Sequence, residues 1–233
     1  MMTSPKILYD ILFNTFGQQY WWPIDRQYHH KQKSDPRFEI IIGAILTQNT
    51  AWTNVEKALD NLKRQKALTI QIIAHIDDWT LKTMIQPSGF FNQKAERLKR
   101  FTSHIEEKYA GDLQEFFSHD TLEIRKELLS LHGIGPETAD SILLYAGNHA
   151  VFVVDSYTKR ICQRFPFPVD CSSYEDIQLF FENALCITTS KKEMVPIFKE
   201  FHALLVKLAK EYCWKNKPHC ITCPLTNLCK KLL

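Results

Sequence analysis

The sequence predicts an all-α protein. Apolar residues recur at helical spacing along most of its 233 residues, and only seven of these residues are glycine. The one strand-like run, Val151 to Val154, is too short and too isolated to build a sheet. A hydrophobic content of 45% predicts a globular core. No apolar run reaches the roughly 18 residues that a membrane span needs, so we expect no membrane association.

The helical pattern extends over nearly the whole chain. The segments that carry it are 5–16, 37–47, 52–65, 69–75, 79–85, 91–108, 112–117, 121–131, 137–147, 155–164, 174–184 and 194–212. A polar stretch, Asp25 to Arg37, separates the first two and contains two adjacent histidines. Its composition predicts a solvated surface loop, in which both histidines face water.

The segment LLSLHGIGPETADSILLYA predicts two helices joined by a sharp turn. Gly133 and Gly135 let the backbone turn with its N–H groups outward, and Pro136 suits the first turn of the second helix. Such a turn before a helix N-terminus can bind a phosphate. The alternative is an ordinary helical hairpin in which Ile134 fills the core.

A single carboxylate follows the apolar run VFVV. Asp155 stands where the next helix begins, and Asp is a favoured N-cap residue. A carboxylate fixed at a helix start is also a candidate for catalysis. The two roles are compatible.

Four cysteines lie near the C-terminus with the spacing C-x6-C-x2-C-x5-C: Cys213, Cys220, Cys223 and Cys229. Four thiolates in so short a segment can wrap one soft-metal centre, and we favour a [4Fe-4S] cluster. Zinc is the main competitor, although only Cys220 and Cys223 form the usual knuckle. The sequence opens without the features of a secretory signal, which disfavours disulfides and predicts a cytoplasmic protein, nucleoid-associated if its source is prokaryotic.

These motifs together resemble a known superfamily. The hairpin GIGPETA, the VVD that follows it and the cysteine spacing occur in the order found in endonuclease III-like, helix-hairpin-helix DNA glycosylases. ILTQNT and PSGFFNQKAERLK are similar to that superfamily too. The resemblance implies a base excision repair enzyme with two helical lobes, a central barrel over 37–149 and a second lobe from 1–36 and 150–233 that carries the cluster. The enzyme would act as a monomer, with double-stranded DNA containing a damaged base across the cleft. A net charge of +3 permits this, provided that any basic surface is local.

The resemblance also assigns roles to the DNA-binding residues. Backbone amides of Gly133, Ile134 and Gly135 would hold a phosphate, a contact that positions the duplex without reading its sequence. Gln48 matches the residue that fills the gap left by the extruded nucleotide. Its alternative role is capping or helix packing.

The superfamily pattern is broken at Glu137. Members that also cleave the backbone carry a lysine at this position, whose amine attacks the sugar and forms a Schiff base. A carboxylate cannot do so, and the resemblance therefore implies a monofunctional enzyme without AP lyase activity. Asp155 would stabilise the positive charge that develops on the sugar and orient or deprotonate the attacking water.

The base pocket is implied by tryptophans. Trp21, Trp22 and Trp52 resemble the 3-methyladenine DNA glycosylase branch, in which aromatic side chains sandwich an alkylated purine and gain a cation–π interaction. Alternatively, these rings anchor the interface between the lobes, and because Trp21 and Trp22 are adjacent, we expect only one to reach the pocket. Lys210 would line the pocket behind Asp155 or face solvent and contact phosphate.

Three functions remain open from sequence. A monofunctional alkylpurine glycosylase is favoured by the tryptophans and by Glu137. A glycosylase for oxidised pyrimidines or mismatched bases is the second, and a noncatalytic protein that binds damaged DNA is the third. Asp155 argues against the third.

Overall fold

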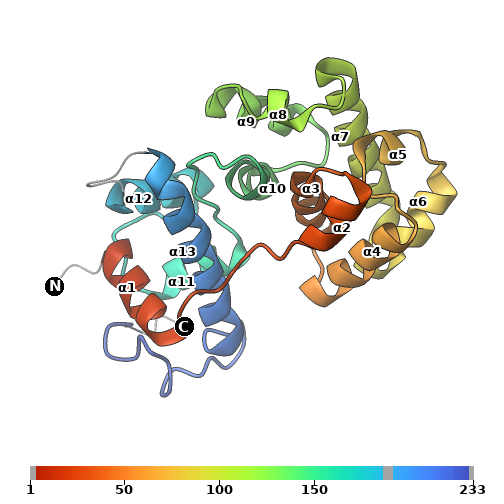
Figure 1. Cartoon of the computed structure of the whole chain (residues 1–233). Coiled ribbons are helices and arrows are strands. Elements are labelled where there is room, and N and C mark those ends of the chain that lie inside the picture. The colour runs from red at the N-terminus through yellow and green to blue at the C-terminus, as the bar shows by residue number, and fades with distance from the viewer. Residues whose placement is uncertain (1–3, 186–190, 231–233) are drawn as a thin grey trace. The chain divides into compact units, whose positions relative to one another are not determined.

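The computed structural model describes residues 4–185 and 191–230, and the regular elements within these ranges are all helical (Figure 1). This agrees with the predicted fold class. No helix in these ranges is long and apolar enough to cross a membrane. The chain divides into two compact units, Trp22–Gly147 and a second one made of Met1–Trp21 with Asn148–Leu233.

The Trp22–Gly147 unit is built around one central helix. Its elements are α2 (Arg26–Gln32), α3 (Pro36–Leu46), α4 (Trp52–Arg64), α5 (Ile70–His75), α6 (Asp78–Ile85), η1 (Gln86–Ser88), α7 (Phe91–Tyr109), α8 (Leu113–Phe116), α9 (Thr121–Ser130), α10 (Pro136–Ser141) and η2 (Ile142–Ala146). Every residue of α3 from Phe38 to Leu46 is buried, because α4, α7, α10 and η2 all pack on it. Aspartates start many of these helices by accepting a backbone N–H from the first turn, as Asp35 does for α3.

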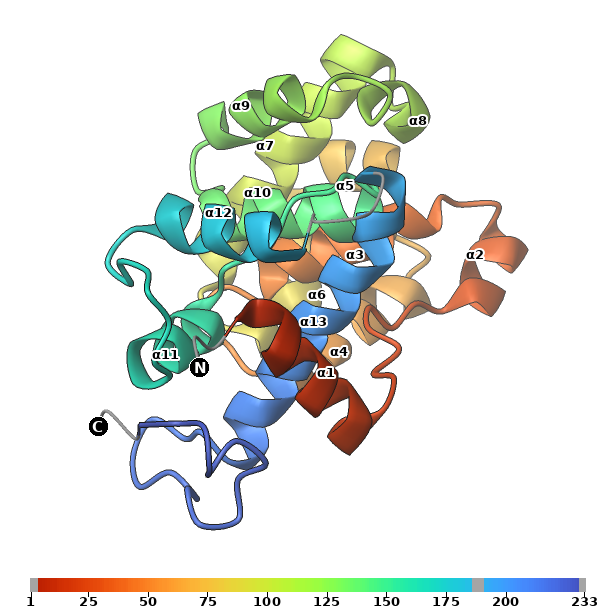
Figure 2. The same ribbon diagram turned by 90° about the vertical axis from the view of Figure 1, so that its left-hand side faces the viewer.

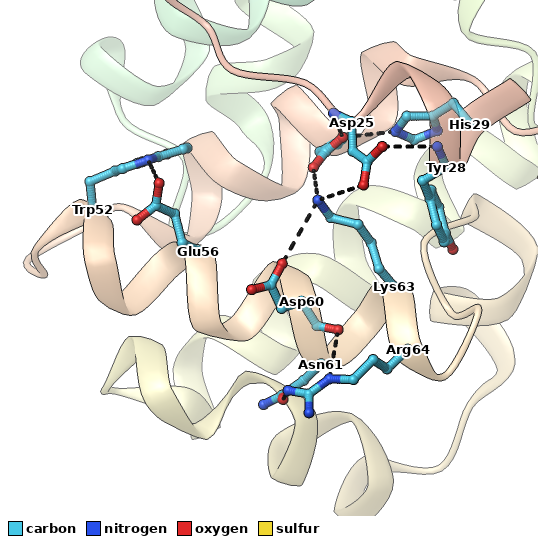
Figure 3. A network of polar contacts seen from close by, with 10 residues as sticks. Asp25, Tyr28, His29, Trp52, Glu56, Asp60, Asn61, Lys63 and Arg64 are labelled. Carbon is cyan, nitrogen blue, oxygen red and sulfur yellow. Dashed lines mark hydrogen bonds and ion pairs between the residues drawn. The ribbon is translucent and has the colours of Figure 1, made fainter.

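The stretch from Asp25 to Arg37 is not the solvated loop that its composition predicts. It forms α2, and His29 is buried against Glu39 of α3, with 2.9 Å between Nε2 and Oε2. Lys63 of α4 reaches the same carboxylate at 2.8 Å (Figure 3). The prediction that both histidines face solvent is therefore wrong for His29. The prediction failed because the partner carboxylate, Glu39, lies on another helix. This contact joins α2 to the Trp22–Gly147 unit.

Glu39 is the charged centre of this cluster. Burial alone would raise the pKa of its carboxyl, but the His29 and Lys63 side chains and the Asp25 amide together hold that pKa below its ordinary value. The side chain is only 2% exposed. The Glu39 carboxylate is therefore ionised although it is buried in the core.

Replacing Glu39 with Gln should lower the free energy of unfolding at pH 7 by about 3 kcal/mol, because the largely buried Lys63 ammonium loses its counter-charge. Since the folded pKa is depressed, this stabilisation is complete above the ordinary carboxyl pKa and is lost as the pH falls through the folded value. Urea unfolding at pH 7 and below about pH 4 measures the difference, which should shrink in acid. Asp10→Asn, in the exposed pair with Lys6, is the control and should cost less than about 1 kcal/mol. Equal losses in both variants would contradict the assignment.

The second unit contains α1 (Pro5–Phe16), α11 (Ser156–Arg164), α12 (Tyr174–Leu185) and α13 (Lys191–Glu211). The long helix α13 packs against both α1 and α11 (Figure 2). An aromatic cluster fills its core, with Phe152 stacked on Phe181 at 4.8 Å and edge-on to Phe198 and Phe201. After α13 the chain continues as an irregular loop that curls back on itself (Figure 2).

The strand-like run Val151 to Val154 is buried, but it lies outside the helices and pairs with no strand in the described chain. Side chains of α12 bond its peptide groups instead. The Phe152 amide donates to Glu182 at 2.8 Å and the Phe152 carbonyl accepts from Gln178 at 2.6 Å. The Val154 amide donates to the Tyr174 hydroxyl at 3.3 Å. This scaffold fixes the residue that follows, Asp155.

Candidate DNA-repair site

The predicted hairpin is present as α9, a turn and α10. Gly133 has a φ of +90°, in the region that favours glycine, and Pro136 opens α10. The Ile134 side chain is buried while its amide donates to the Leu131 carbonyl at 3.0 Å. Ile134 therefore fills the core, as in the alternative interpretation. Its amide is engaged in the turn, which makes the amides of Gly133 and Gly135 the better candidates for a phosphate.

A buried ion pair braces the two helices of the hairpin. Asp140 of α10 is fully buried, and its carboxylate accepts two hydrogen bonds from the Arg125 guanidinium of α9, at 2.7 and 3.1 Å. A bidentate pair of this kind fixes orientation as well as distance. The helices on either side of the turn are thereby held in register.

Gln48 contacts the hairpin within the same unit. Its Nε2 donates to the Gly133 carbonyl and to the Thr138 hydroxyl, each at 2.9 Å, and its Oε1 accepts from Arg97. The amide thus ties the loop after α3 to both sides of the turn. This is the packing role that the sequence left as an alternative, and a role in DNA binding stays a prediction.

A buried lysine holds the start of the same loop. Lys94 of α7 is fully buried and donates to the Leu46 carbonyl at 2.8 Å and the Ser88 carbonyl at 2.7 Å. Burial, with a smaller contribution from Arg97, lowers the pKa of Lys94 to about 8. Its ammonium closes the end of α3 and so positions the chain just before Gln48.

Gly133→Ala should destabilise the protein by about 1–2 kcal/mol, because an L side chain is strained at a φ of +90°. The added Cβ would also collide with the Arg97 side chain, lying 2.7 Å from its Cδ. Gly135→Ala is the matched control, since nothing lies within 4 Å of its Cβ position and its φ is −95°. Thermal unfolding of both variants checks this, and a larger loss in Gly135→Ala would overturn the interpretation.

Asp155 is the N-cap of α11 and is buried. Its Oδ1 accepts the Thr158 amide at 2.7 Å, and its Oδ2 lies 3.5 Å from His202 Nε2. Burial would raise the pKa of this carboxyl, but His202 and the Thr158 amide and hydroxyl outweigh it and hold the pKa below its ordinary value. The structure therefore presents a desolvated, ionised carboxylate at the predicted position.

Two of the three predicted pocket tryptophans form a cluster in the Trp22–Gly147 unit. Trp22 lies over Gly43, meets Trp52 edge-on at 5.3 Å and 88°, and contacts Tyr145 at 5.2 Å. Rings at right angles do not make a parallel sandwich, so a base stacking here without rearrangement would use one ring face. Trp21 belongs to the other unit.

The polar contacts of Trp52 and Lys210 complete the description of the predicted base-pocket residues. The Trp52 indole N–H donates to Glu56 at 2.9 Å (Figure 3). Lys210 is exposed, with its Nζ 6.0 Å from the centre of the Tyr157 ring. Its place in a base pocket stays a prediction.

All four C-terminal cysteines line one pocket. Its wall is shared by apolar residues of α11 and α13 and by Cys213, Cys220, Cys223 and Cys229. In residues 4–185 and 191–230, no three His, Cys, Asp or Glu side chains are arranged to hold a single metal ion. The thiols instead surround a common space.

Arginines of α11 attach the cysteine loop. Arg164 donates to the carbonyls of Trp214 and Lys215, at 2.6 and 2.9 Å, and its guanidinium lies 3.5 Å from Cys213 Sγ. Arg160 donates to the Cys213 carbonyl at 2.8 Å. The loop is therefore docked on the helix that Asp155 starts.

Sequence reasoning missed Arg97, His202 and Arg164, because each acts through a partner remote in the chain. One signal was available for His202. It stands in FHALLVKLA, where a histidine on the apolar face of a helix must find a buried partner.

Residues 42–185 match the HhH-GPD superfamily of base excision DNA repair proteins. The chain belongs to this superfamily. It is 43% identical over 224 residues to a Methanocaldococcus jannaschii protein whose name places it among DNA repair glycosylases, with 95% of this chain and 94% of that protein covered. Endonuclease III of Thermotoga maritima is 30% identical, over 87% of this chain and 85% of its own length. These relatives confirm the endonuclease III-like resemblance, and the chain is a DNA glycosylase of base excision repair.

Solved structures of DNA glycosylases have a fold similar to that of this chain. The chain resembles the H. pylori 3-methyladenine DNA glycosylase bound to 1,N6-ethenoadenine, with a TM-score of 0.70, 27% identity, and 89% of this chain and 98% of that one covered. Endonuclease III in a trapped covalent complex with DNA has the same fold, with a TM-score of 0.74, 23% identity and coverage of 99% and 97%.

Proposed function

We propose that this enzyme is a monofunctional DNA glycosylase that hydrolyses the N-glycosidic bond of a flipped, alkylated purine such as 3-methyladenine. The proposal rests on two residues considered together. Glu137, an exposed carboxylate, stands where related lyases carry a lysine, and Asp155 is a buried, ionised carboxylate. A glutamate has no amine to form a Schiff base. Hydrolysis assisted by Asp155 is the chemistry that these two residues support.

Asp155 would act on the sugar. Cleavage of the N-glycosidic bond builds positive charge near C1′, and a fixed carboxylate stabilises that charge more strongly in a dry site than in water. The same carboxylate can orient the attacking water and accept its proton. Its Oδ1 already accepts the Thr158 amide, so the side chain is held in place at the start of α11.

The alkylpurine substrate is supported by the aromatic cluster and by the structural likeness to the H. pylori enzyme. Methylation at N3 or N7 places positive charge on the purine, and stacking on an indole then gains a cation–π energy of about 1–2 kcal/mol. The methylated base is also a good leaving group. An enzyme without a strong general acid suffices for it.

A [4Fe-4S] cluster fits the C-terminal pocket. Four thiols that line one pocket with apolar walls, and the Arg164 guanidinium beside Cys213, suit a group ligated by thiolates. Cys213, Cys220, Cys223 and Cys229 would hold it. When bound, it would order a loop that has little core of its own.

Base release from methylated duplex DNA tests the function. We expect free 3-methyladenine or 7-methylguanine, strand breaks only after alkali, and no borohydride-trapped covalent complex. Asp155→Asn should retain DNA binding and the fold while losing about 10²–10⁴-fold in single-turnover rate. Alkali-independent nicking would refute the monofunctional assignment, and release of oxidised pyrimidines alone would favour the endonuclease III-like alternative.

Iron and acid-labile sulfide analysis tests the cluster. We expect both in equal amounts per chain, with a visible thiolate-to-iron absorbance, and loss of both in Cys220→Ser. Cys171→Ser is the control, because Cys171 does not line the pocket. Zinc without sulfide would show that the site is a structural zinc centre.

A further inference from the structure

His202 of α13 faces the proposed catalytic carboxylate. Its Nε2 lies 3.5 Å from Asp155 Oδ2, and the two side chains are only 8% and 10% exposed. α11 and α13 pack directly on each other, so this approach is fixed by helix packing within one unit. The histidine comes from a helix 47 positions further along the chain.

The two oxygens of Asp155 have different partners. Oδ1 is engaged by the Thr158 amide as part of the N-cap of α11, a contact that any capping aspartate makes. Capping leaves Oδ2 unexplained, and this is the oxygen that His202 meets. A buried carboxylate needs such a partner, since desolvation favours its neutral form.

We propose that His202 is a positioning residue for the reaction: it fixes the second oxygen of Asp155 and keeps the carboxylate ionised. The proposal rests on the proposed function, because it assumes that Asp155 must be ionised for base release. It concerns the charge of Asp155, and His202 itself touches no substrate.

The other groups around this carboxylate do not take over that role. On α11, burial raises the pKa of the Cys162 thiol, which is therefore neutral. From α12, Tyr174 and Glu182 accept the amides of Val154 and Phe152. His202 is the titratable side chain that faces Oδ2 from α13.

The first experiment measures the carboxylate directly, without activity. In protein labelled with ¹³C at the aspartate carboxyl carbons, the Asp155 signal is assigned by its loss in Asp155→Asn. His202→Leu should raise the pKa of Asp155 by about one pH unit or more, because burial remains and the opposing partner is gone. His202→Gln, whose amide can donate a hydrogen bond to the carboxylate, should give a smaller rise.

The second experiment follows single-turnover base release against pH. Removing His202 should move the acidic limb of the rate profile to higher pH, so that the rate loss relative to wild type is roughly tenfold greater at acid pH than at alkaline pH. His202→Gln should recover most of the rate. Leu205→Ala, a buried residue of the same helix, controls for loss of packing and should lower thermal stability without moving the limb.

The outcomes separate the two claims. An unchanged Asp155 titration in His202→Leu, or rate profiles parallel to those of Leu205→Ala, would overturn the role of His202 even if Asp155→Asn is inactive. Full activity of Asp155→Asn would instead remove the proposed catalytic function. The carboxyl titration would still decide whether His202 controls the charge of Asp155.

Discussion

A buried segment outside helices and sheets must find hydrogen-bond partners for its peptide groups elsewhere, and the second unit is organised around this constraint. Unpaired N–H and C=O groups in a core cost about 1–3 kcal/mol each. Glu182, Gln178 and Tyr174 of α12 supply partners for the peptide groups of Phe152 and Val154. Phe152 stacks on α12 as well, at 4.8 Å from Phe181. A single helix therefore both satisfies and packs the segment that delivers Asp155.

The delivery of Asp155 also depends on where α11 lies. The carboxylate caps one end of this helix, while Arg160 and Arg164, further along it, donate to the carbonyls of the cysteine loop. Their cationic groups near the C-terminal part of α11 also suit the helix dipole. A loop with little core of its own is thereby coupled to the position of α11. Docking of the cysteine loop and placement of Asp155 therefore depend on the same helix, α11.

The sequence predicts most of this architecture where the signal is local. Helical spacing places α4 and α7 within a residue or two of their observed bounds, and the glycines and Pro136 identify the hairpin. Asp155 is recognised as an N-cap because capping is a short-range contact. Local patterns also suffice to group the four cysteines, whose thiols line one pocket.

What the sequence does not predict are contacts between polar residues on different helices. α2 is mostly polar, and His29 becomes a core residue because Glu39 of α3 and Ser34 bond its two ring nitrogens. The pairs Asp155 with His202 and Arg125 with Asp140 likewise join helices that composition treats separately. Which buried polar residues meet depends on how the helices pack, and the hydrophobic periodicity of the sequence does not predict that packing.

Gln48 shows how such a network limits a functional residue. Its amide contacts Gly133, Thr138 and Arg97, so filling a gap in DNA would require these hydrogen bonds to be exchanged for others. Each net exchange involves only about 0.5–1.5 kcal/mol, because one polar partner replaces another. The scaffold beneath is more costly to disturb, since Lys94 and its two carbonyl acceptors are buried. The side chain can therefore change partners while the loop that carries it stays fixed, which is what the predicted insertion of Gln48 into the duplex would require.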